Sequence, residues 1–206
     1  MILAVFLLFL STRMDTFQLF TSISQHISLD KTDEAYLQSI LLPMKVKQNE
    51  FIETAGEVTR YFIHVTDGCL MTYYTDQEAN DHVVQFSTAG WWTGDLQSFT
   101  SESPSIYSTK ALTNSGVLLL LINQMNTLLD RYPKFEKFFR IIFQNSLITH
   151  QQRIIQNLSD PAEKRYQNFI EKYPTLEQFV PQKHIASYLG ITPEFLSKIR
   201  RKLMDK

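Results

Sequence analysis

The spacing of apolar residues divides the chain into a helical, a β-rich and a second helical stretch. In residues 15–42, apolar side chains such as Phe17, Phe20 and Ile23 recur every three or four positions, which predicts helices. Asp30 or Thr32 can cap the second of these helices. This period is lost between residues 44 and 122, and it returns from Asn123 onward.

The middle stretch predicts an antiparallel β-domain. Its runs of β-branched and aromatic residues are short, and Asp67-Gly68 separates the first two in the manner of a hairpin turn. Short strands at this spacing, without long helices between them, favour a barrel or jelly roll over a parallel sheet. The expected strands are 60–65, 69–74, 82–86, 106–112 and 117–122.

A long helix is predicted over residues 135–158, after a short one at 126–130. Its apolar stripe, which includes Phe135, Ile142 and Leu158, is wide for a helix with one neighbour. The helix could simply pack on the β-domain. We expect instead that it also forms the seam of a homodimer, provided that the chain binds DNA. Ser159-Asp160-Pro161 then breaks the chain and marks the expected domain boundary.

The terminal segment 182–202 has the pattern of two helices joined by a tight turn. Gly190 occupies the turn, where a positive φ is needed, and Thr192 can cap the helix that follows. Pro193 and Glu194 suit the first turn of that helix. All features of a helix-turn-helix unit are therefore present in register. Its apolar positions are Ile185, Leu189, Ile191, Leu196 and Ile199.

Charge is distributed in agreement with this interpretation. The whole chain has a net charge of −1, but residues 181–206 hold six Lys or Arg against two acidic residues, a net of +4. A basic segment is expected where a protein contacts DNA phosphates. A solvated helix face would also be basic, and the turn pattern decides between the two. The partner that we expect is double-stranded DNA.

Contact roles follow from placing the second helix in the major groove. Glu194, Ser197, Lys198 and Arg201 lie on the face opposite Leu196 and Ile199. Lys198 and Glu194 are candidates for base edges, since lysine donates to guanine and glutamate accepts from cytosine. The expected phosphate contacts are Gln182, Lys183, Thr192, Arg201 and Lys202.

A β-rich domain, a long helix and a terminal helix-turn-helix together resemble the Crp/Fnr (catabolite activator-like) transcription regulators. The resemblance covers residues 14–203, and the block 180–201 resembles the Bacteroidetes-type branch. It implies an α+β fold with a double-stranded β-helix (jelly-roll, cyclic-nucleotide-binding-like) sensor, a dimer about the long helix and a palindromic DNA site. RNA polymerase is a further candidate partner. Because the chain stops at Lys206, we expect most of the family's β-wing to be missing.

The resemblance also implies a domain order. Residues 14–125 would form the sensor, 126–158 the dimerisation helix region, and 159–206 the DNA-binding domain.

The phosphate-binding cassette of the family is altered in this chain. Gly94, Asp95 and Leu96 match its beginning, but Asp95 replaces the usual glutamate. Where the family has an arginine beside a serine or threonine, this chain has Ser105 and Ile106. An anionic cyclic phosphate would lack its bidentate guanidinium partner. We therefore expect no cyclic AMP binding and no cofactor; the pocket holds another small-molecule effector or none.

Metal-based sensing and enzymatic activity are weaker hypotheses. The single cysteine, Cys69, excludes an Fnr-type iron–sulfur cluster held by this chain alone. A haem ligated by His64 or His82 lacks a second ligand at a suggestive spacing, and a structural role is favoured for both. The alternative is a jelly-roll (cupin-type) small-molecule-binding protein or enzyme that does not bind DNA, but the sequence has no His-x-His pair.

The apolar run Met1–Leu10 is too short to span a bilayer, which needs roughly 20 residues. We interpret residues 1–13 as a mis-called start, with Met14 as the initiator, or as a short apolar extension. A membrane-tethered sensor anchored by this run is the third hypothesis. The expected location is the cytoplasm, without a membrane partner.

Overall fold

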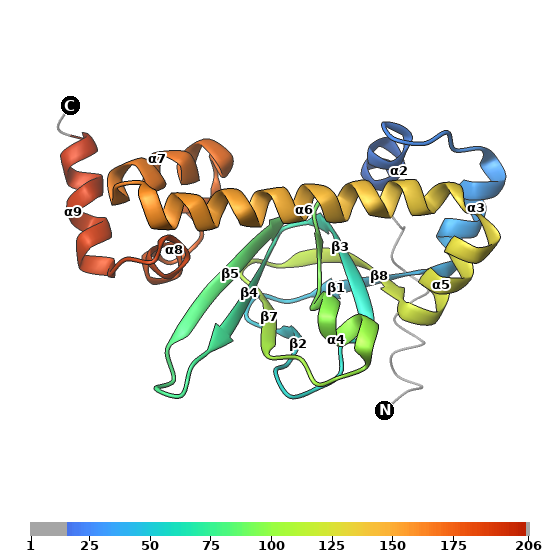
Figure 1. Ribbon diagram of the computed structural model, residues 1–206, viewed down its shortest axis with the longest axis horizontal. Coiled ribbons are helices and arrows are strands. Elements are labelled where there is room, and N and C mark those ends of the chain that lie inside the picture. Colours follow the sequence, from blue (N-terminus) through green and yellow to red (C-terminus); the bar gives the residue numbers. More distant parts are fainter. Residues whose placement is uncertain (1–15, 205–206) are drawn as a thin grey trace. The chain divides into compact units, whose positions relative to one another are not determined.

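The computed structural model describes residues 16–204, so the predictions for residues 1–13 lie outside its described part. The chain forms two compact units. One comprises the residues up to Thr72 together with Phe86–Ile142, and the other comprises Tyr73–Gln85 together with the residues from Phe143 onward. The long helix α6 (Lys134–Ser159) is continuous and contributes to both units (Figure 1).

The first unit begins with α2 (Phe17–Ser24) and α3 (Lys31–Ile40). Asp30 caps α3, as predicted, because its carboxylate accepts from the amides of Thr32 and Asp33 at 2.8 and 2.9 Å. The Asp33 side chain accepts from the Asp30 amide at 2.8 Å, which completes a capping box. The helical stretch predicted to reach residue 42 ends earlier, since Leu41 already pairs with Leu120 in a strand.

The strands form two antiparallel four-stranded sheets, so the expected β-domain is a sandwich. The first has the order β1-β8-β3-β6 and the second has the order β2-β7-β4-β5. The sequence pattern missed β1, β2 and β6, which are short or contain a proline. The strand bounds are β1 (Leu41–Val46), β2 (Phe51–Glu53), β3 (Tyr61–Asp67), β4 (Cys69–Thr75), β5 (Asp81–Thr88), β6 (Trp92–Thr93), β7 (Tyr107–Ala111) and β8 (Ser115–Leu121).

Apolar side chains from the strands make the core of this unit. Ile63, Leu70 and Val117 are almost completely buried in one cluster. Two shorter helices, α4 (Leu96–Ser101) and α5 (Ile122–Arg131), interrupt and follow the strands. In the first turns of α6, Phe135 and Phe138 are fully buried, so this part of the helix belongs to the core.

The second unit is mainly helical. After α6 come α7 (Ala162–Lys172), the short η1 (Leu176–Gln178), α8 (Gln182–Leu189) and α9 (Pro193–Met204) (Figure 1). An aromatic cluster holds α7 and α8 together: the ring of Phe169 lies 5.3 Å from that of Tyr173 and 5.6 Å from that of Tyr188. The helix predicted at 135–158 extends one residue further at each end.

Candidate nucleic-acid interface and sensor site

A tight turn at Gly190 joins α8 to α9. Gly190 has φ +65°, in the left-handed region that favours glycine, and its amide donates to the Ser187 carbonyl at 3.1 Å. Thr192 accepts a hydrogen bond from the Phe195 amide at 3.2 Å and so caps α9. Leu196 and Ile199 are buried. These contacts fix the rotation of α9 about its own axis and therefore which side chains it presents to solvent.

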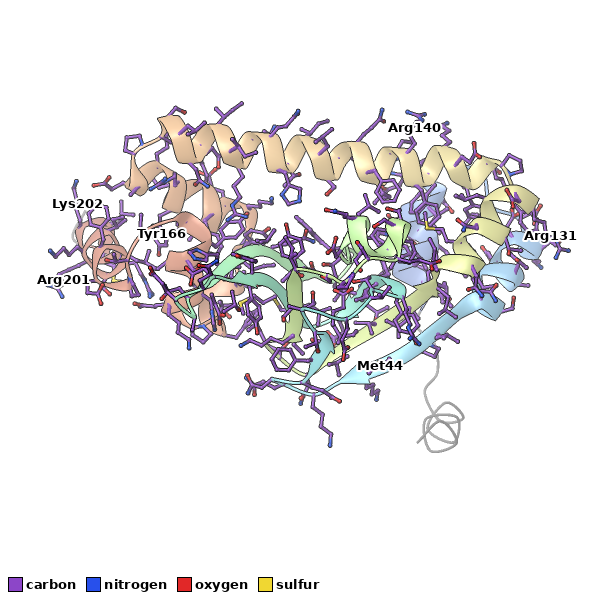
Figure 2. The ribbon with its side chains drawn as sticks, turned by 60° about the horizontal axis from the view of Figure 1, so that its bottom comes forward. Met44, Arg131, Arg140, Tyr166, Arg201 and Lys202 are labelled. Atoms are coloured by element: carbon purple, nitrogen blue, oxygen red, sulfur yellow. The ribbon has the colours of Figure 1, made fainter. Side chains whose placement is uncertain are left out.

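The opposite face of α9 is polar and mostly exposed. Glu194, Lys198, Arg201 and Lys202 are all exposed, and Figure 2 shows Arg201 and Lys202 projecting outward from the helix. The Lys202 ammonium lies 3.2 Å from the carboxylate of Glu163 on α7. The pKa of Glu194 is lowered by hydrogen bonds from its own backbone amide and from Thr192.

The predicted contacts at the start of α8 lie beside this face. Gln182 and Lys183 are exposed, and the Ser197 hydroxyl donates to the Gln182 side chain at 3.2 Å. Ser197 itself is half-buried and also donates to the Pro193 carbonyl. The structure therefore brings the residues predicted from α8 and α9 onto one surface.

Arg200 differs from its neighbours because it faces inward. Its guanidinium lies 3.7 Å from the Glu177 carboxylate, which also accepts a hydrogen bond from the Tyr166 hydroxyl. Burial, reinforced by Glu177, raises the pKa of Tyr166 to about 12. Figure 2 shows Tyr166 lying inward among the helices. This network joins α7, η1 and α9, and sequence periodicity indicated none of it.

Arg153 of α6 is a second residue that the sequence analysis missed. Its guanidinium donates to the backbone carbonyls of Val83, at 2.8 Å, and Val84 in the β4–β5 hairpin. It also donates to the Tyr188 carbonyl at 3.0 Å and lies over the Tyr188 ring, 4.1 Å from its centre. One side chain thus links the hairpin to α8 within the second unit.

The α8 residue Ser187 makes a parallel connection. Its hydroxyl donates to the Asp81 carbonyl at 2.7 Å and accepts from the Val83 amide at 2.9 Å. No local pattern marks Arg153 or Ser187, because their partners are backbone groups 35 or more positions away for Arg153 and more than 100 for Ser187.

In the first unit, the polar groups of the cassette that was expected to bind phosphate form hydrogen bonds with one another. Gly94 has φ +141°, and a Cβ at this position would lie 3.2 Å from the Tyr61 carbonyl. Asp95 caps α4 by accepting from the amides of Gln97 and Ser98 at 3.0 and 3.2 Å. Its second oxygen accepts from the Ser105 hydroxyl at 2.9 Å. The Asp95 carboxylate is therefore occupied by internal contacts.

The other two predicted effector contacts point elsewhere. Leu96 and Ile106 are 42% and 56% exposed. An open pocket of about 550 Å³ lies beside the cassette, and it is lined by residues 52–54 and 57–61. None of the five predicted effector residues is among these lining residues.

This sensor pocket contains a buried carboxylate. Burial raises the pKa of Glu53, although its Oε2 accepts from the Thr109 hydroxyl at 2.8 Å. Within the described residues, Glu53 Oε1 and Thr59 Oγ1 are both buried. Among the described residues, Arg60 is the one cation that lines the pocket, and Glu57 lines it too. The pocket is thus acidic at its base rather than a ready anion site.

His64, His82 and Cys69 have the surroundings of residues with a structural role. His64 is fully buried with its ring centre 5.0 Å from that of Trp92, and burial lowers its pKa to about 4. His82 Nε2 lies 2.7 Å from the Asp76 carboxylate. Burial raises the pKa of Cys69 to about 12. Residues 16–204 contain no group of three or more His, Cys, Asp or Glu arranged to hold a metal ion.

Comparison with known proteins defines the class of the sandwich. Residues 43–132 match the family described as cyclic nucleotide-binding domain. This stretch of the chain is therefore similar to domains of this type. No curated protein matches the chain. In the described part of the chain, no helix is long and apolar enough to cross a membrane.

Solved structures of bacterial regulators share the fold. FixK2 from Bradyrhizobium japonicum is 14% identical with a TM-score of 0.70, over 81% of this chain and 85% of that one. The c-di-GMP responsive global regulator CLP of Xanthomonas campestris is 11% identical with a TM-score of 0.66, over 85% and 92%. A mutant of CooA from Carboxydothermus hydrogenoformans is 14% identical with a TM-score of 0.67, over 94% and 86%. These identities establish likeness of fold.

Proposed function

We propose that the protein is a transcription regulator of the Crp/Fnr type that binds double-stranded DNA through a helix-turn-helix formed by α8 and α9. The observation that carries this proposal is the exposed basic face of α9, held in place by the buried Leu196 and Ile199. The fold likeness to FixK2, CLP and CooA supports it. Residues 14–125 would act as the sensor, 126–158 as the dimerisation region and 159–206 as the DNA-binding domain.

The N-terminal end of α9 would enter the major groove. Lys198 and Glu194, both exposed, are the proposed contacts to base edges. Phosphate contacts are proposed for Gln182, Lys183, Thr192, Arg201 and Lys202, with Ser197 bridging the two helices through Gln182. Lys202 would exchange its ion pair with Glu163 for a phosphate.

The second half of α6 supports a homodimer. Its large apolar side chains are half or more exposed, with Leu158 at 82%. Leu147 and Ile154 are seven positions apart, as are Ile148 and Ile155, so both pairs recur with the heptad spacing of a two-helix seam. Burying this stripe against the same stripe of a second copy gives a two-fold dimer and hence a palindromic operator.

The sensor would not respond to cyclic AMP. Asp95 and Ser105 bond to each other, and the neighbouring pocket presents the buried carboxylate of Glu53. A cyclic phosphate placed there would meet like charge instead of a bidentate guanidinium. Isothermal titration calorimetry with cyclic AMP should show no binding. A dissociation constant in the micromolar range would contradict this part of the proposal.

A random-library DNA selection with the purified full chain tests the main proposal. We expect enrichment of a motif with two-fold symmetry and half-sites about one helical turn apart. The double variant Lys198→Ala/Arg201→Ala serves as the comparison, because it removes two exposed charges without touching the buried side of α9. Selection of no symmetric motif by the unmodified chain would refute the function.

A further inference from the structure

A small pocket in the second unit lies among the C-terminal half of α6, α7 and the end of α8. Its volume is about 70 Å³, whereas a single water molecule needs roughly 10–15 Å³ measured in the same way. It therefore has room for a small polyatomic ion. We call it the α6–α7 pocket, and none of the proposed DNA contacts lines it.

The α6–α7 pocket is strongly basic. Arg153, Arg165 and Lys172 line it, and no Asp or Glu is among its described lining residues. The remaining polar lining includes the amide side chains of Asn157 and Asn168, which offer further N–H donors. Three cations and several amides around one small space make a surrounding that favours an anion.

The positive charges act on one another as well. The pKa of Lys172 is lowered by burial and by the neighbouring charge of Arg153. The pKa of His150 is lowered by burial and then by Arg153 and Lys172. Both shifts have the direction expected where positive charge is incompletely neutralised.

The two arginines keep unused hydrogen-bonding capacity. Arg153 donates to three backbone carbonyls, and Arg165 donates to the Asn157 carbonyl at 3.2 Å. Among the ion pairs of the described residues, none includes Arg153 or Arg165. The Nε atom of each guanidinium is buried without a partner in residues 16–204. A planar guanidinium without a carboxylate is well suited to an oxyanion.

We propose that the α6–α7 pocket binds a small oxyanion of phosphate size, contacted by Arg165, Lys172 and the neighbouring amides. The anion would neutralise the field that Arg153 experiences. Because Arg153 also holds the β4–β5 hairpin and the Tyr188 carbonyl of α8, occupancy would stabilise the arrangement of α8 against α6 within the second unit. This would be a ligand site in the helical unit, separate from the sensor pocket.

Calorimetry of the full chain with inorganic phosphate, at constant ionic strength maintained with sodium chloride, tests the proposal. We expect saturable binding to one site per chain. Arg165→Gln and Lys172→Gln should each weaken it by about tenfold or more, because each removes a charged donor. Arg165→Lys keeps the charge but not the planar guanidinium, so its phosphate affinity should lie between those of Arg165→Gln and the unmodified chain.

The matched control is Lys164→Gln. Lys164 lies on α7 beside Arg165, pairs with Asp160 at 3.1 Å and does not line the pocket, so phosphate binding should be unchanged. Circular dichroism of each variant checks that the fold is kept. Absence of saturable binding would overturn the proposal, as would equal weakening by Lys164→Gln. Weaker DNA binding by Arg165→Gln with unchanged phosphate binding would also overturn it, because the pocket would then serve the DNA backbone.

Discussion

The turns at Gly94 and Gly190 both precede a capped helix, but the two helices differ in what surrounds them. In each, a glycine with positive φ precedes a capping side chain, Asp95 or Thr192, and then a helix. The Asp95 carboxylate that caps α4 faces inward and accepts a hydrogen bond from the Ser105 hydroxyl. Helix α4 itself has no charged side chain. Helix α9 instead presents Lys198, Arg201 and Lys202 to solvent. Both glycines have positive φ, although the values differ (+141° and +65°), and the two helices differ most in the charge and exposure of their side chains.

The largest effect should come from removing the apolar anchor of either helix. Phe99 of α4 and Leu196 of α9 are buried to 2% and 0% exposure. Phe99→Ala should lower the free energy of unfolding by about 3–5 kcal/mol and Leu196→Ala by about 2–5 kcal/mol, since each leaves a cavity.

Urea denaturation measures both changes. The controls are Leu96→Ala and Phe195→Ala, whose side chains are 42% and 44% exposed in the same two helices. These control substitutions should lower the free energy of unfolding clearly less than Phe99→Ala and Leu196→Ala do. Equal losses in anchors and controls would mean that these helices are not held by their buried faces.

The next effect concerns DNA and would sharpen the contrast between the two helices. Lys198→Ala should weaken binding to the selected operator by about 1–3 kcal/mol while affecting random DNA much less. Fluorescence anisotropy over a salt series measures both affinities. Lys47→Ala, at an exposed position in the first unit, is the control. Equal loss on operator and random DNA would reassign Lys198 to a phosphate contact.

A smaller effect is expected from the caps themselves. Thr192→Ala removes one hydrogen bond to the start of α9 and should cost about 1 kcal/mol. Asp95→Ala removes two capping bonds and one of the acceptors of the buried Ser105 hydroxyl, so it should cost more. Thermal unfolding of both variants decides the order. A larger loss for Thr192→Ala would contradict the picture of a closed cassette.

The smallest expected effect depends on pH and tests the buried carboxylate beside the cassette. Because burial raises the pKa of Glu53 in the folded state, the folded chain binds this proton more tightly than the unfolded chain does. The contribution to stability is present below the unfolded pKa and is lost as the pH rises through the folded value.

Glu53→Gln should therefore stabilise the protein more at pH 7 than at pH 4, as measured by urea midpoints. Glu57→Gln, which changes an exposed carboxylate lining the same pocket, is the control and should show no such difference. An equal response of Glu53→Gln at both pH values would show that Glu53 ionises normally.

Periodicity and turn chemistry in the sequence by themselves predicted the division into helical and β-rich stretches, a cap at Asp30 or Thr32 and the turn at Gly190, because these depend on near neighbours. The extra strands β1, β2 and β6 appeared only in the structure, since their residues pair with partners 28 to 79 positions away. The missing arginine of the cassette was evident from the sequence, but the bond between Asp95 and Ser105 was not.

Only the tertiary structure showed where the buried charges lie. No local pattern marks Glu53 or Arg153, yet Glu53 lines the pocket of residues 52–54 and 57–61 and Arg153 lines the α6–α7 pocket. The physical reason is that burial and electrostatic fields arise from side chains distant in sequence, whereas caps and helical faces arise within a few residues. The turn at Gly190 was thus predictable from the sequence, whereas the different surroundings of the helices after Gly94 and Gly190 became clear only from the packing around each.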